Sequence, residues 1–558
     1  MSKKRYRILA VVPARGGSKG IQRKNLRMLN GKPLLWYILG AAKKSKFITD
    51  LVVSTEDTEI AQLSRLFNVD TIKRPAKFSE DSITLDPVIE HAVSSREKEK
   101  NTRYDLVITL QPTSPLIQPQ TIDKAISLFC QKKADTLISV TAERHLYWRI
   151  EKGQPRPMYK KRVNRQKLEP IFQEAGAILI SQRNIVTPQS RIGGKIILFE
   201  LPEKESLDID SYDDWHIARH RLTKQRIVIR TSGYSQIGLG HIYRTLTLAL
   251  HIYTHEIIFM TEAKHALGLK KLKEYHFPVV AFRDEEDFFR KLKKINPSIV
   301  INDILNTTPD YILKLKKMGK FVVNFEDLGE GSLKADLVFN SIYEFTSQAP
   351  NHYFGYKYEC VRDEFFLYRQ EKTRKNVKKI TVTFGGTDPN NLTKRVLKAL
   401  GLISIKGIKI NVVLGLGFSS TYQKEIAQTT RRLKKNNHLE IKQNIKNMAQ
   451  ELYDSDLVIT SNGRTVYEVV TLGIPCLTIS QNDRELTHLF SHVAFGVVNL
   501  GHANTATAKI IAENLKKLIK NYKLRKEMAK NLRSYHIEQG TETVVKKILN
   551  TFFAKMIK

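Results

Sequence analysis

Cysteine is scarce in this chain of 558 residues, which contains three cysteines. Cys130, Cys360 and Cys476 form no CxxC pair or Cys/His cluster, so the sequence indicates neither a disulfide framework nor a zinc site. No stretch approaches the roughly 18 apolar residues of a membrane span. The short apolar run near the start meets Arg15 at once, which is typical of a first strand rather than a signal peptide. We therefore expect a cytoplasmic protein without stable membrane insertion.

A concentrated block of charge is also missing. The 92 lysines and arginines outnumber the 56 aspartates and glutamates, giving a formal net charge of +36, but they are scattered along the whole chain. No aromatic-interleaved basic patch of the RNA-binding type is evident. A nucleotide-sensing or RNA-binding protein is nevertheless one alternative, and it predicts steep salt dependence on polynucleotide without turnover. We expect no nucleic-acid partner, although the basic amphipathic helix expected at 507–532 is compatible with contact with a membrane surface.

The chain alternates short β-branched runs with amphipathic segments, which predicts parallel sheets covered by helices. In the first part the expected strands are 8–12, 51–55, 106–110 and 135–140, and a helix is expected at 121–133. The pattern restarts near residue 223 with the expected strands 226–230, 255–260, 298–303 and 321–325, followed by 380–386, 410–415, 456–460 and 475–480. The sequence thus predicts an α/β protein with domains at 1–223, 224–372 and 373–558, the last two being Rossmann-like lobes with a cleft between them.

A glycine-rich turn follows the first expected strand. Gly16, Gly17, Ser18 and Gly20 allow a tight turn that aims backbone N–H groups at one anion. Arg15 and Lys24 would then neutralise a triphosphate. The stretch matches neither a Walker A loop nor GxGxxG, and such a turn alone is equally compatible with a structural loop.

Two later stretches bring further polar groups. "LQPTSPL" (110–116) ends a strand with Gln111 and Thr113 at its carboxyl end, where ligands bind in open α/β sheets. "SLDID" places Asp208 and Asp210 two residues apart, so an extended backbone turns both carboxylates to one face. Beside a triphosphate, two carboxylates suit Mg²⁺, whereas an isolated DxD is also common in acidic surface turns.

Together these stretches resemble the CMP-sugar-acid synthetases, the cytidylyltransferases that activate N-acylneuraminate and related nonulosonic acids, over residues 6 to about 220. The resemblance implies a GT-A-like nucleotidyltransferase domain that uses CTP, Mg²⁺ and a nonulosonic acid, and that forms a homodimer. It implies that phosphates are held by the loop of Arg15, Gly16, Gly17, Ser18 and Lys24, and that the cytidine is bound by Asn25 and Arg74. It also implies that the sugar acid is bound by Gln111, Thr113 and Arg165, and that the metal is held by Asp208 and Asp210. Gln22 and "EAGAILI" (174–180) depart from the family pattern.

The second half contains three more strand-to-helix turns. "SQIGLGHIYR" (235–244) leads through His241 into a helix, "FGGTDPNN" (384–391) follows a strand, and "SNGRTVYE" (461–468) opens a helix that ends at "GIP". A glycine turn at a helix N-terminus suits an anion, and a histidine there can transfer a proton near neutral pH. Taken alone, His241 is more typical of a structural or surface histidine, and Glu468 is equally typical of an exposed helical position.

These turns resemble those of the UDP-sugar hydrolases of the pseudaminic acid pathway, relatives of the two-lobed GT-B glycosyltransferases, over residues 226 to about 500. The resemblance implies that His241 is the general base for attack of water on a UDP-sugar. It implies that the diphosphate and uridine are held without metal by Gly386, Thr387, Ser461, Gly463 and Glu468. The departures lie at Ser232 and Gly233, where the family often has an acidic residue.

The combined prediction is a bifunctional enzyme of nonulosonic acid biosynthesis. Its amino-terminal half transfers CMP to a nonulosonic acid, and its carboxyl-terminal half hydrolyses a UDP-linked diacetamido-trideoxyhexose. A second enzymatic interpretation makes the carboxyl-terminal half a GT-B glycosyltransferase with an acceptor other than water. The identities of both sugars stay open at this point.

Overall fold

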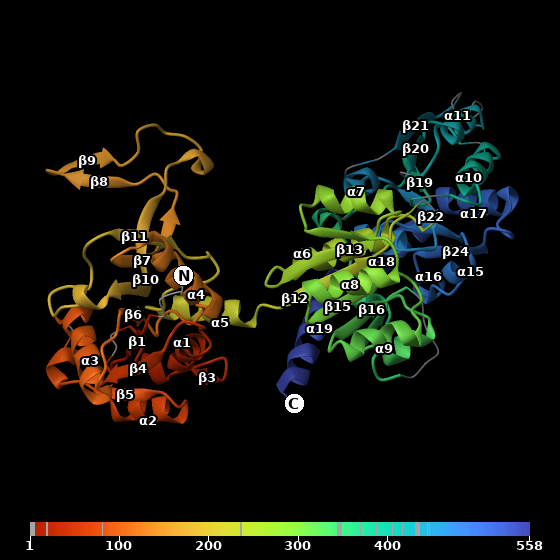
Figure 1. Cartoon of the computed structure of the whole chain (residues 1–558). Helices are drawn as coiled ribbons and strands as arrows, with labels where there is room; N and C mark the ends of the chain where they lie inside the picture. Colours follow the sequence, from red (N-terminus) through yellow and green to blue (C-terminus); the bar gives the residue numbers. More distant parts are fainter. Residues whose placement is uncertain are drawn as a thin grey trace. The chain divides into compact units, whose positions relative to one another are not determined.

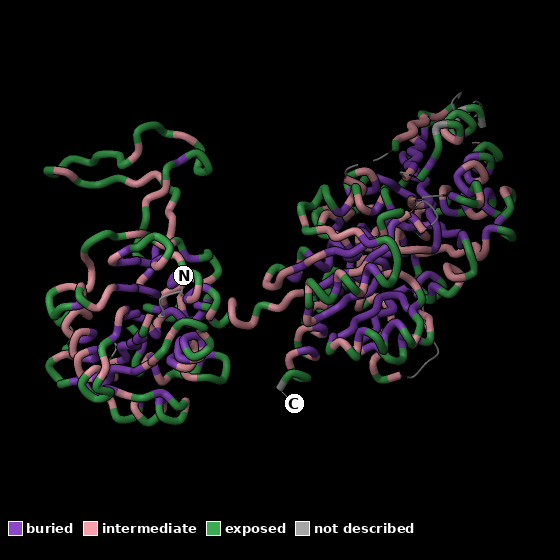
Figure 2. Tube along the Cα trace, in the orientation of Figure 1, coloured by how far each residue is buried: buried purple, intermediate pink, exposed green. Residues whose placement is uncertain are grey.

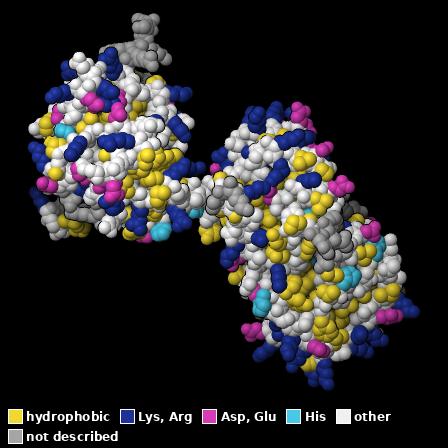
Figure 3. All heavy atoms as spheres, turned by 90° about the horizontal axis from the view of Figure 1, so that it is seen from below, with side chains coloured by type: hydrophobic (Ala, Val, Ile, Leu, Met, Phe, Trp, Pro, Cys, Tyr) yellow, Lys and Arg dark blue, Asp and Glu magenta, His cyan; other side chains and the backbone are white. Residues whose placement is uncertain are grey.

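The computed structural model describes residues 6–17, 20–80, 82–234, 237–342, 349–368, 370–386, 388–403, 405–415, 417–429, 433, 436–443, 445 and 447–557. The chain forms two compact units, Met1–Lys224 and Gln225–Lys558 (Figure 1). Among the described residues, no helix combines the length and the apolar character that crossing a membrane requires. On the face of each unit seen in Figure 3, lysine and arginine side chains are dispersed among other residue types.

The first unit is built on a seven-stranded sheet in the order β11-β7-β10-β6-β1-β4-β5. β10 runs antiparallel to β6 and β7, whereas β1, β4, β5 and β6 are parallel. The strands are β1 (Ile8–Pro13), β4 (Asp50–Thr55), β5 (Asp70–Lys73), β6 (Leu106–Leu110), β7 (Thr136–Glu143), β10 (Ile171–Gln182) and β11 (Ile196–Glu200). The helices are α1 (Leu34–Lys43), α2 (Thr58–Leu66), α3 (Leu85–Lys100), α4 (Pro119–Lys132) and α5 (Tyr212–Thr223).

Helices cover both faces of this sheet, which explains why β1 is apolar at every position. Alternate side chains of β1 point to opposite faces. Ile8, Ala10 and Val12 pack with α1 and α4, while Leu9 and Val11 pack with α3. A strand buried on both faces carries a continuous hydrophobic run rather than an alternating one, as the first expected strand does.

A hairpin of β8 (Trp148–Glu151) and β9 (Gln154–Pro157) projects from the first unit (Figure 1). Figure 2 shows that its trace is mainly exposed. Its residues include large apolar side chains, since Trp148 is 54% and Ile150 71% accessible to solvent. The hairpin therefore contributes little to the core of its own unit.

The second unit contains two parallel sheets, one for each lobe. The amino-terminal lobe has the order β14-β13-β12-β15-β16-β17-β18, and the carboxyl-terminal lobe has β21-β20-β19-β22-β23-β24. The first set is β12 (Arg226–Thr231), β13 (Glu256–Glu262), β14 (Val279–Phe282), β15 (Ile299–Asp303), β16 (Phe321–Phe325), β17 (Leu337–Asn340) and β18 (His352–Phe354). The second set is β19 (Lys379–Thr383), β20 (Lys409–Leu414), β21 (His438–Gln443), β22 (Leu457–Ser461), β23 (Cys476–Ser480) and β24 (Val497–His502).

Helices again sandwich each sheet. Around the amino-terminal lobe lie α6 (Gly240–His251), α7 (Ala266–Glu274), α8 (Glu285–Ile295), α9 (Pro309–Lys317) and α19 (Gly540–Ile557). Around the carboxyl-terminal lobe lie α10 (Leu392–Gly401), α11 (Ser420–Thr429), α13 (Met448–Tyr453), α14 (Thr465–Leu472), α15 (Asp483–Leu486), α16 (Leu489–Val493), α17 (Ala508–Lys520) and α18 (Tyr522–Leu532). The last helix returns to the other lobe, where Val544 and Ile548 pack with the strand residue Ile227.

The α/β fold predicted from the sequence is confirmed, and each expected strand is present within one to three residues of its expected ends. The prediction of one continuous helix at 507–532 is wrong, because the segment forms two helices, α17 and α18. It breaks at Asn521, whose side-chain oxygen accepts a hydrogen bond from the Leu524 N–H at 2.9 Å and starts α18. Its apolar face is buried against the carboxyl-terminal lobe through Ile511, Leu515 and Met528, because an amphipathic stripe of this width is typical of core-facing helices.

Candidate nucleotide sites

The first glycine turn directly follows β1 and is anchored by Glu56. The Gly16 N–H donates to Oε1 of Glu56 at 2.7 Å, and the other carboxylate oxygen accepts from Nε of Arg74 at 2.8 Å. A Cβ on Gly16 would lie 2.3 Å from a carboxylate oxygen of Asp57, so a side chain does not fit there. The turn therefore needs glycine because β4 and its loop approach so closely.

The two residues expected to hold cytidine lie beside this turn and are buried. Nδ2 of Asn25 donates to the carbonyl of Arg15 at 3.0 Å. Asn25 and Arg74 are 7% and 4% accessible, and the Asn25 Oδ1 and Arg74 Nη2 atoms are buried without a hydrogen-bond partner among the described residues. Buried polar atoms are rarely left unpaired, so one acceptor and one donor are available to a ligand here.

The acidic stretch 208–210 packs against the same turn. Nζ of Lys24 donates to the Ile209 carbonyl at 2.5 Å and lies 3.2 Å from Oδ1 of Asp210. A Cβ on Gly20 would lie 2.2 Å from the Asp210 carbonyl oxygen. The Ile209 N–H donates to the Thr113 carbonyl at 2.9 Å, which ties this stretch to the end of β6. Three segments far apart in the sequence thus meet at one place.

The carboxylates of Asp208 and Asp210 differ in environment. The Asp210 side chain is 80% accessible, whereas Oδ1 of Asp208 is buried without a hydrogen-bond partner among the described residues. Burial raises the pKa of Asp208 against the opposing effect of the Thr113 side chain, and the Asp210 charge adds a smaller increase. A cation placed between the two carboxylates would offset both effects.

The residues expected to meet the sugar acid are divided between two elements. Gln111, at the end of β6, lies next to Gly176 on β10, where a Cβ would lie 3.0 Å from the Gln111 amide nitrogen. Gly176 has φ of +65°, so glycine is also favoured by the backbone. Arg165 begins an exposed 3-10 turn, Arg165–Lys167, and no described contact joins it to the first turn. Ser18 lies outside the described residues, and nothing fills the space beside Gly17.

In the second unit a cavity of about 640 Å³ lies between the lobes. It is lined by the glycine turn before α6, the turn after β19 and the start of α14, and it contains the predicted residues His241, Gly386, Ser461, Gly463 and Glu468. Thr387 lies outside the described residues. The volume lies in the usual range of small-molecule sites.

Bare backbone forms the contact between the lobes at this cavity. A Cβ on Gly386 would lie 2.9 Å from Cα of Gly238, and a Cβ on Gly415 would lie 2.6 Å from Cα of Gly386. Gly238 has φ of +71°, which few side chains tolerate. The two glycine turns that the sequence singled out are therefore in direct van der Waals contact.

His241 is oriented by a carboxylate that the sequence analysis did not identify. Its Nδ1 contacts Oδ1 of Asp303, the last residue of β15, and Asp303 also accepts from Nε of Arg244 at 2.8 Å and from Nη2 at 2.6 Å. Burial alone would raise the pKa of Asp303, but Arg244 and His241 outweigh it and hold that pKa well below its usual range. An ionised Asp303 fixes the proton on Nδ1 of His241 and leaves Nε2 as the basic nitrogen.

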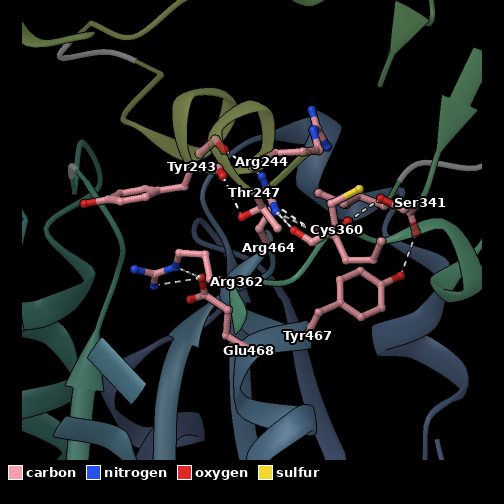
Figure 4. A network of polar contacts seen from close by, with 12 residues as sticks. Tyr243, Arg244, Thr247, Ser341, Cys360, Arg362, Arg464, Tyr467 and Glu468 are labelled. Atoms are coloured by element: carbon pink, nitrogen blue, oxygen red, sulfur yellow. Dashed lines mark hydrogen bonds and ion pairs between the residues drawn. The ribbon is translucent and has the colours of Figure 1, made fainter. Parts of the chain in front are cut away.

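A chain of polar contacts extends from His241 across the lobes. Nη1 of Arg244 donates to Glu326 at 3.0 Å, and the Ser341 hydroxyl lies within hydrogen-bond distance of the carboxylates of both Glu326 and Glu359. Glu359 forms an ion pair of 2.7 Å with Arg464 on the carboxyl-terminal lobe. Figure 4 shows Arg244 and Ser341 of the amino-terminal lobe near Arg464 of the carboxyl-terminal lobe.

Arg464 closes this chain on the backbone beside His241. Its Nη1 donates to the Gly240 carbonyl at 2.6 Å and its Nη2 to the Cys360 carbonyl at 2.7 Å (Figure 4). Nearby, Glu468 accepts from Nη2 of Arg362 at 3.0 Å. Arg464, at the start of α14, therefore holds the turn that carries His241. No local sequence motif indicates this role, because the partners of Arg464 are distant from it in the sequence.

Glu485 is a further lining residue that sequence reasoning missed. Its carboxylate accepts from the Gln481 N–H at 2.8 Å, and a Cβ on Gly463 would lie 3.4 Å from its Oε1. Burial raises the pKa of Glu485 to about 7. A carboxyl group that changes its charge near neutral pH thus faces the turn at which a diphosphate is expected.

Comparisons with known proteins match both halves. Residues 9–187 match the family described as "Cytidylyltransferase", and residues 379–547 match "Glycosyltransferase family 28 C-terminal domain". The "Post-translational flagellin modification protein B" of Campylobacter coli is 30% identical over 227 residues, which cover 39% of this chain and 97% of that protein. The "N-acylneuraminate cytidylyltransferase A" of Danio rerio is 31% identical over 230 residues, or 40% of this chain and 52% of that protein.

The chain spans about half the length of the first two curated relatives that it matches, 56% and 52%. Among solved structures, MurG of Acinetobacter baumannii is 17% identical with a TM-score of 0.45, and the match covers 59% of this chain and 99% of MurG.

Proposed function

The amino-terminal unit of this chain belongs to the cytidylyltransferase family and its carboxyl-terminal lobe carries a glycosyltransferase family 28 C-terminal domain; from this premise we propose a bifunctional enzyme of sugar-acid metabolism. Its first unit transfers CMP from CTP to a sialic-acid-like sugar. The observation that carries this proposal is the convergence of the glycine turn, Lys24 and the 208–210 stretch at one place. The relatives that act on N-acylneuraminate support the substrate class.

In the proposed reaction the anomeric hydroxyl of the sugar acid attacks the α-phosphorus of CTP. The new oxygen–phosphorus bond forms as the bond to the β-phosphate oxygen breaks; pyrophosphate leaves with the electron pair, and the hydroxyl proton passes to solvent. Arg15 and Lys24 offset the charge that grows on the leaving oxygens. Asn25 and Arg74 present one unpaired acceptor and one unpaired donor to the base, which supports their assignment to cytidine.

Mg²⁺ is the proposed cofactor of this unit, and the residues present fit it. Asp208 keeps an unpartnered buried oxygen and Asp210 an accessible carboxylate, which are the hard oxygen ligands that Mg²⁺ prefers. When bound, the ion would supply charge neutralisation for the phosphates. We propose no metal for the second unit, because the first residues of α6 and α14 line the cavity and a helix N-terminus can offset the charge of a diphosphate.

Pyrophosphate release tests the first activity. The full-length protein is incubated with CTP, Mg²⁺ and a panel of sialic, legionaminic and pseudaminic acids. Release that requires one of the acids is expected, with neutral sugars as the control. If CTP is turned over with no acid of the panel, the proposed reaction is contradicted. If one acid is preferred, it identifies the substrate.

We propose that the second unit cleaves the glycosidic bond of a UDP-sugar, with His241 as the base. In the hydrolytic form, predicted for a UDP-linked diacetamido-trideoxyhexose, His241 takes a proton from water. The water oxygen bonds to the anomeric carbon, and UDP leaves with the electron pair of the broken bond. The placement of His241, Gly386, Ser461 and Glu468 around one cavity supports this assignment.

The match to glycosyltransferase family 28 favours a second candidate, in which another acceptor replaces water. The two candidates share the donor site and differ in the nucleophile. UDP release and free sugar formation are measured with a UDP-sugar alone and with candidate acceptors. Equal release without acceptor supports the hydrolase, whereas strict dependence on an acceptor supports the glycosyltransferase.

We further propose that the chain forms a homodimer through its first unit. The β8–β9 hairpin and the start of β10 expose Trp148, Ile150 and Phe172, which are 54%, 71% and 46% accessible. Large apolar side chains gathered on a projecting hairpin are typical of a surface that a second copy covers. Light scattering should give twice the mass of the chain, and Ile150→Ser with Trp148→Ser should give the monomer; an unchanged mass in that variant would exclude this interface.

A further inference from the structure

A second cavity, of about 740 Å³, lies in the amino-terminal lobe of the second unit, and none of the residues assigned above to the two proposed reactions lines it. It is formed at the carboxyl ends of β12, β13 and β15, and it is separate from the 640 Å³ cavity that holds His241. Both cavities reach the loop after β15, because Leu305 lines the 640 Å³ cavity and Asn306 lines the 740 Å³ cavity. The new cavity therefore adjoins the nucleotide cavity on the same lobe.

Arg230, near the end of β12, brings to this cavity a positive charge that no carboxylate pairs among the described residues. Its guanidinium lies over three aromatic rings, with its Cζ 5.1 Å from the centre of Phe282, 4.5 Å from Phe288 and 4.8 Å from Tyr311. Among the described residues, no carboxylate lies within ion-pair distance of it. Stacking on ring faces holds the planar guanidinium in place while leaving its edge available for hydrogen bonds.

The carboxylates of the same cavity already have partners. Glu262 pairs with Lys264 at 2.6 Å, and Glu285 pairs with Lys314 at 3.0 Å. Each pair is close to neutral as a unit, so the charge of Arg230 is not cancelled from within the cavity. Arg230 is half-buried, and a bound anion would supply a counter-ion for its charge.

His265 provides a second, independent indication of a ligand. It lines the cavity and is 5% accessible, and its Nδ1 is buried without a hydrogen-bond partner among the described residues. Its ring stacks on Tyr234 with centres 4.6 Å apart. The orientation of the imidazole is therefore fixed by packing, and its unpaired Nδ1 would gain a partner from a polar group bound in the cavity.

We propose that this cavity binds a polyhydroxylated carboxylate, a sugar acid, with the carboxylate on Arg230 and a hydroxyl or amide group on His265. The guanidinium edge matches a carboxylate in two parallel hydrogen bonds. The remaining lining offers the hydroxyl and amide groups of Ser232, Asn306 and Thr308, which suit several ligand hydroxyls. A volume of about 740 Å³ is also far larger than an inorganic anion needs. The site belongs to the second unit and is independent of the CMP-transfer site.

Hydrogen–deuterium exchange of the full chain tests this proposal without CTP or UDP, so its outcome does not depend on either activity. N-acetylneuraminate is the probe. The expected result is saturable protection of peptides that contain residues 228–234 and 262–269. In Arg230→Gln the apparent affinity of that protection should fall about tenfold to a hundredfold. Protection of first-unit peptides alone would overturn the proposal.

Two further ligands and two further variants complete the experiment. N-acetylmannosamine, which lacks a charge, and inorganic phosphate should each protect these peptides at least about tenfold more weakly; equal protection by either ligand would overturn the sugar-acid assignment. Arg283→Gln is the matched control, because Arg283 is an exposed arginine outside the cavity, 75% accessible. Arg230→Lys preserves the charge if Arg230→Gln fails to fold, and normal affinity in Arg230→Lys would exclude a bidentate contact.

Discussion

Nζ of Lys24 lies 3.2 Å from Oδ1 of Asp210, although 186 positions of sequence separate the two residues. The same ammonium donates to the Ile209 carbonyl at 2.5 Å. The late acidic stretch thereby forms one wall of the turn that follows the first strand. The lysine balances a carboxylate in the absence of ligand, and a divalent cation on Asp208 and Asp210 would release it for the phosphates of CTP.

Asp210→Asn should lower pyrophosphate release at least about a hundredfold while leaving UDP release from a UDP-sugar unchanged. The amide removes the accessible one of the two carboxylates that would hold Mg²⁺. Both products are measured on the same preparation. Asp213→Asn is the matched control, because Asp213 is an exposed residue in the first turn of α5. Loss of both activities in Asp210→Asn would contradict separate sites.

His241→Asn should do the reverse, lowering UDP release about a hundredfold or more without affecting pyrophosphate release. Asparagine preserves polarity at the start of α6 but cannot act as a base near neutral pH. His251→Asn, at the other end of the same helix, is the control, since His251 pairs with Asp363 on the surface. Near-normal UDP release from His241→Asn would remove His241 from the mechanism.

Arg464→Leu should lower the free energy of unfolding of the second unit by about 3–5 kcal/mol. The change leaves the carboxylate of Glu359, which is 1% accessible, without its cationic partner. Urea unfolding is followed by far-ultraviolet circular dichroism. Trp36, Trp148 and Trp215, the three tryptophans of the chain, all lie in the first unit, so their fluorescence reports whether that unit is unaffected.

The double variant Arg464→Leu with Glu359→Gln is the control for this effect. It removes the buried charge together with its partner and should regain much of the lost stability. A double variant as unstable as the sum of its two single variants would show that the ion pair is not what Arg464 contributes.

Glu485 predicts a pH dependence of stability. Its pKa is raised to about 7 in the folded state, against an ordinary value of 4.5. Between these values the folded state holds a proton that the unfolded state has lost. The contribution of Glu485 to the free energy of unfolding therefore falls as the pH rises through this window, by at most about 1.4 kcal/mol per pH unit.

The same carboxyl should weaken UDP binding above pH 7, because its charge then opposes the diphosphate. Glu485→Gln should flatten both dependences between pH 5 and pH 8, measured by urea unfolding and by calorimetric titration with UDP. An unchanged pH dependence of stability in this variant would show that Glu485 does not titrate in that range.

The parallel core of both units could be predicted from the sequence because strands buried on two faces are continuous apolar runs. Residues 8–12 and 227–229 are examples, and helices cover both faces of each. The strands that escaped prediction are short, partly exposed or unusual in direction. β10 is antiparallel and bends at Gly176, so its pattern follows neither an alternating nor a continuous apolar rule. The break at Asn521 was missed because asparagine is tolerated within a helical pattern.

The glycine turns of the sites could be predicted because a bare backbone next to a strand has a local signature. Gly386 and Gly238 prove to be in contact across the lobes, which two independent local patterns could not reveal. Asp303, Arg464 and Glu485 have no such signature, since each acts through partners distant in sequence. Asp303 appears only as the last residue of an ordinary strand, and its role depends on Arg244 and His241 reaching it from another helix.

The most direct test of the central assignment is phosphorus NMR of the full chain with CTP, Mg²⁺ and the preferred sugar acid. The account predicts a phosphodiester signal of a CMP-sugar that grows in equal amount with pyrophosphate, and its loss in Asp210→Asn. Formation of CDP with inorganic phosphate, or a CTP spectrum that stays unchanged with every acid of the panel, would contradict the assignment.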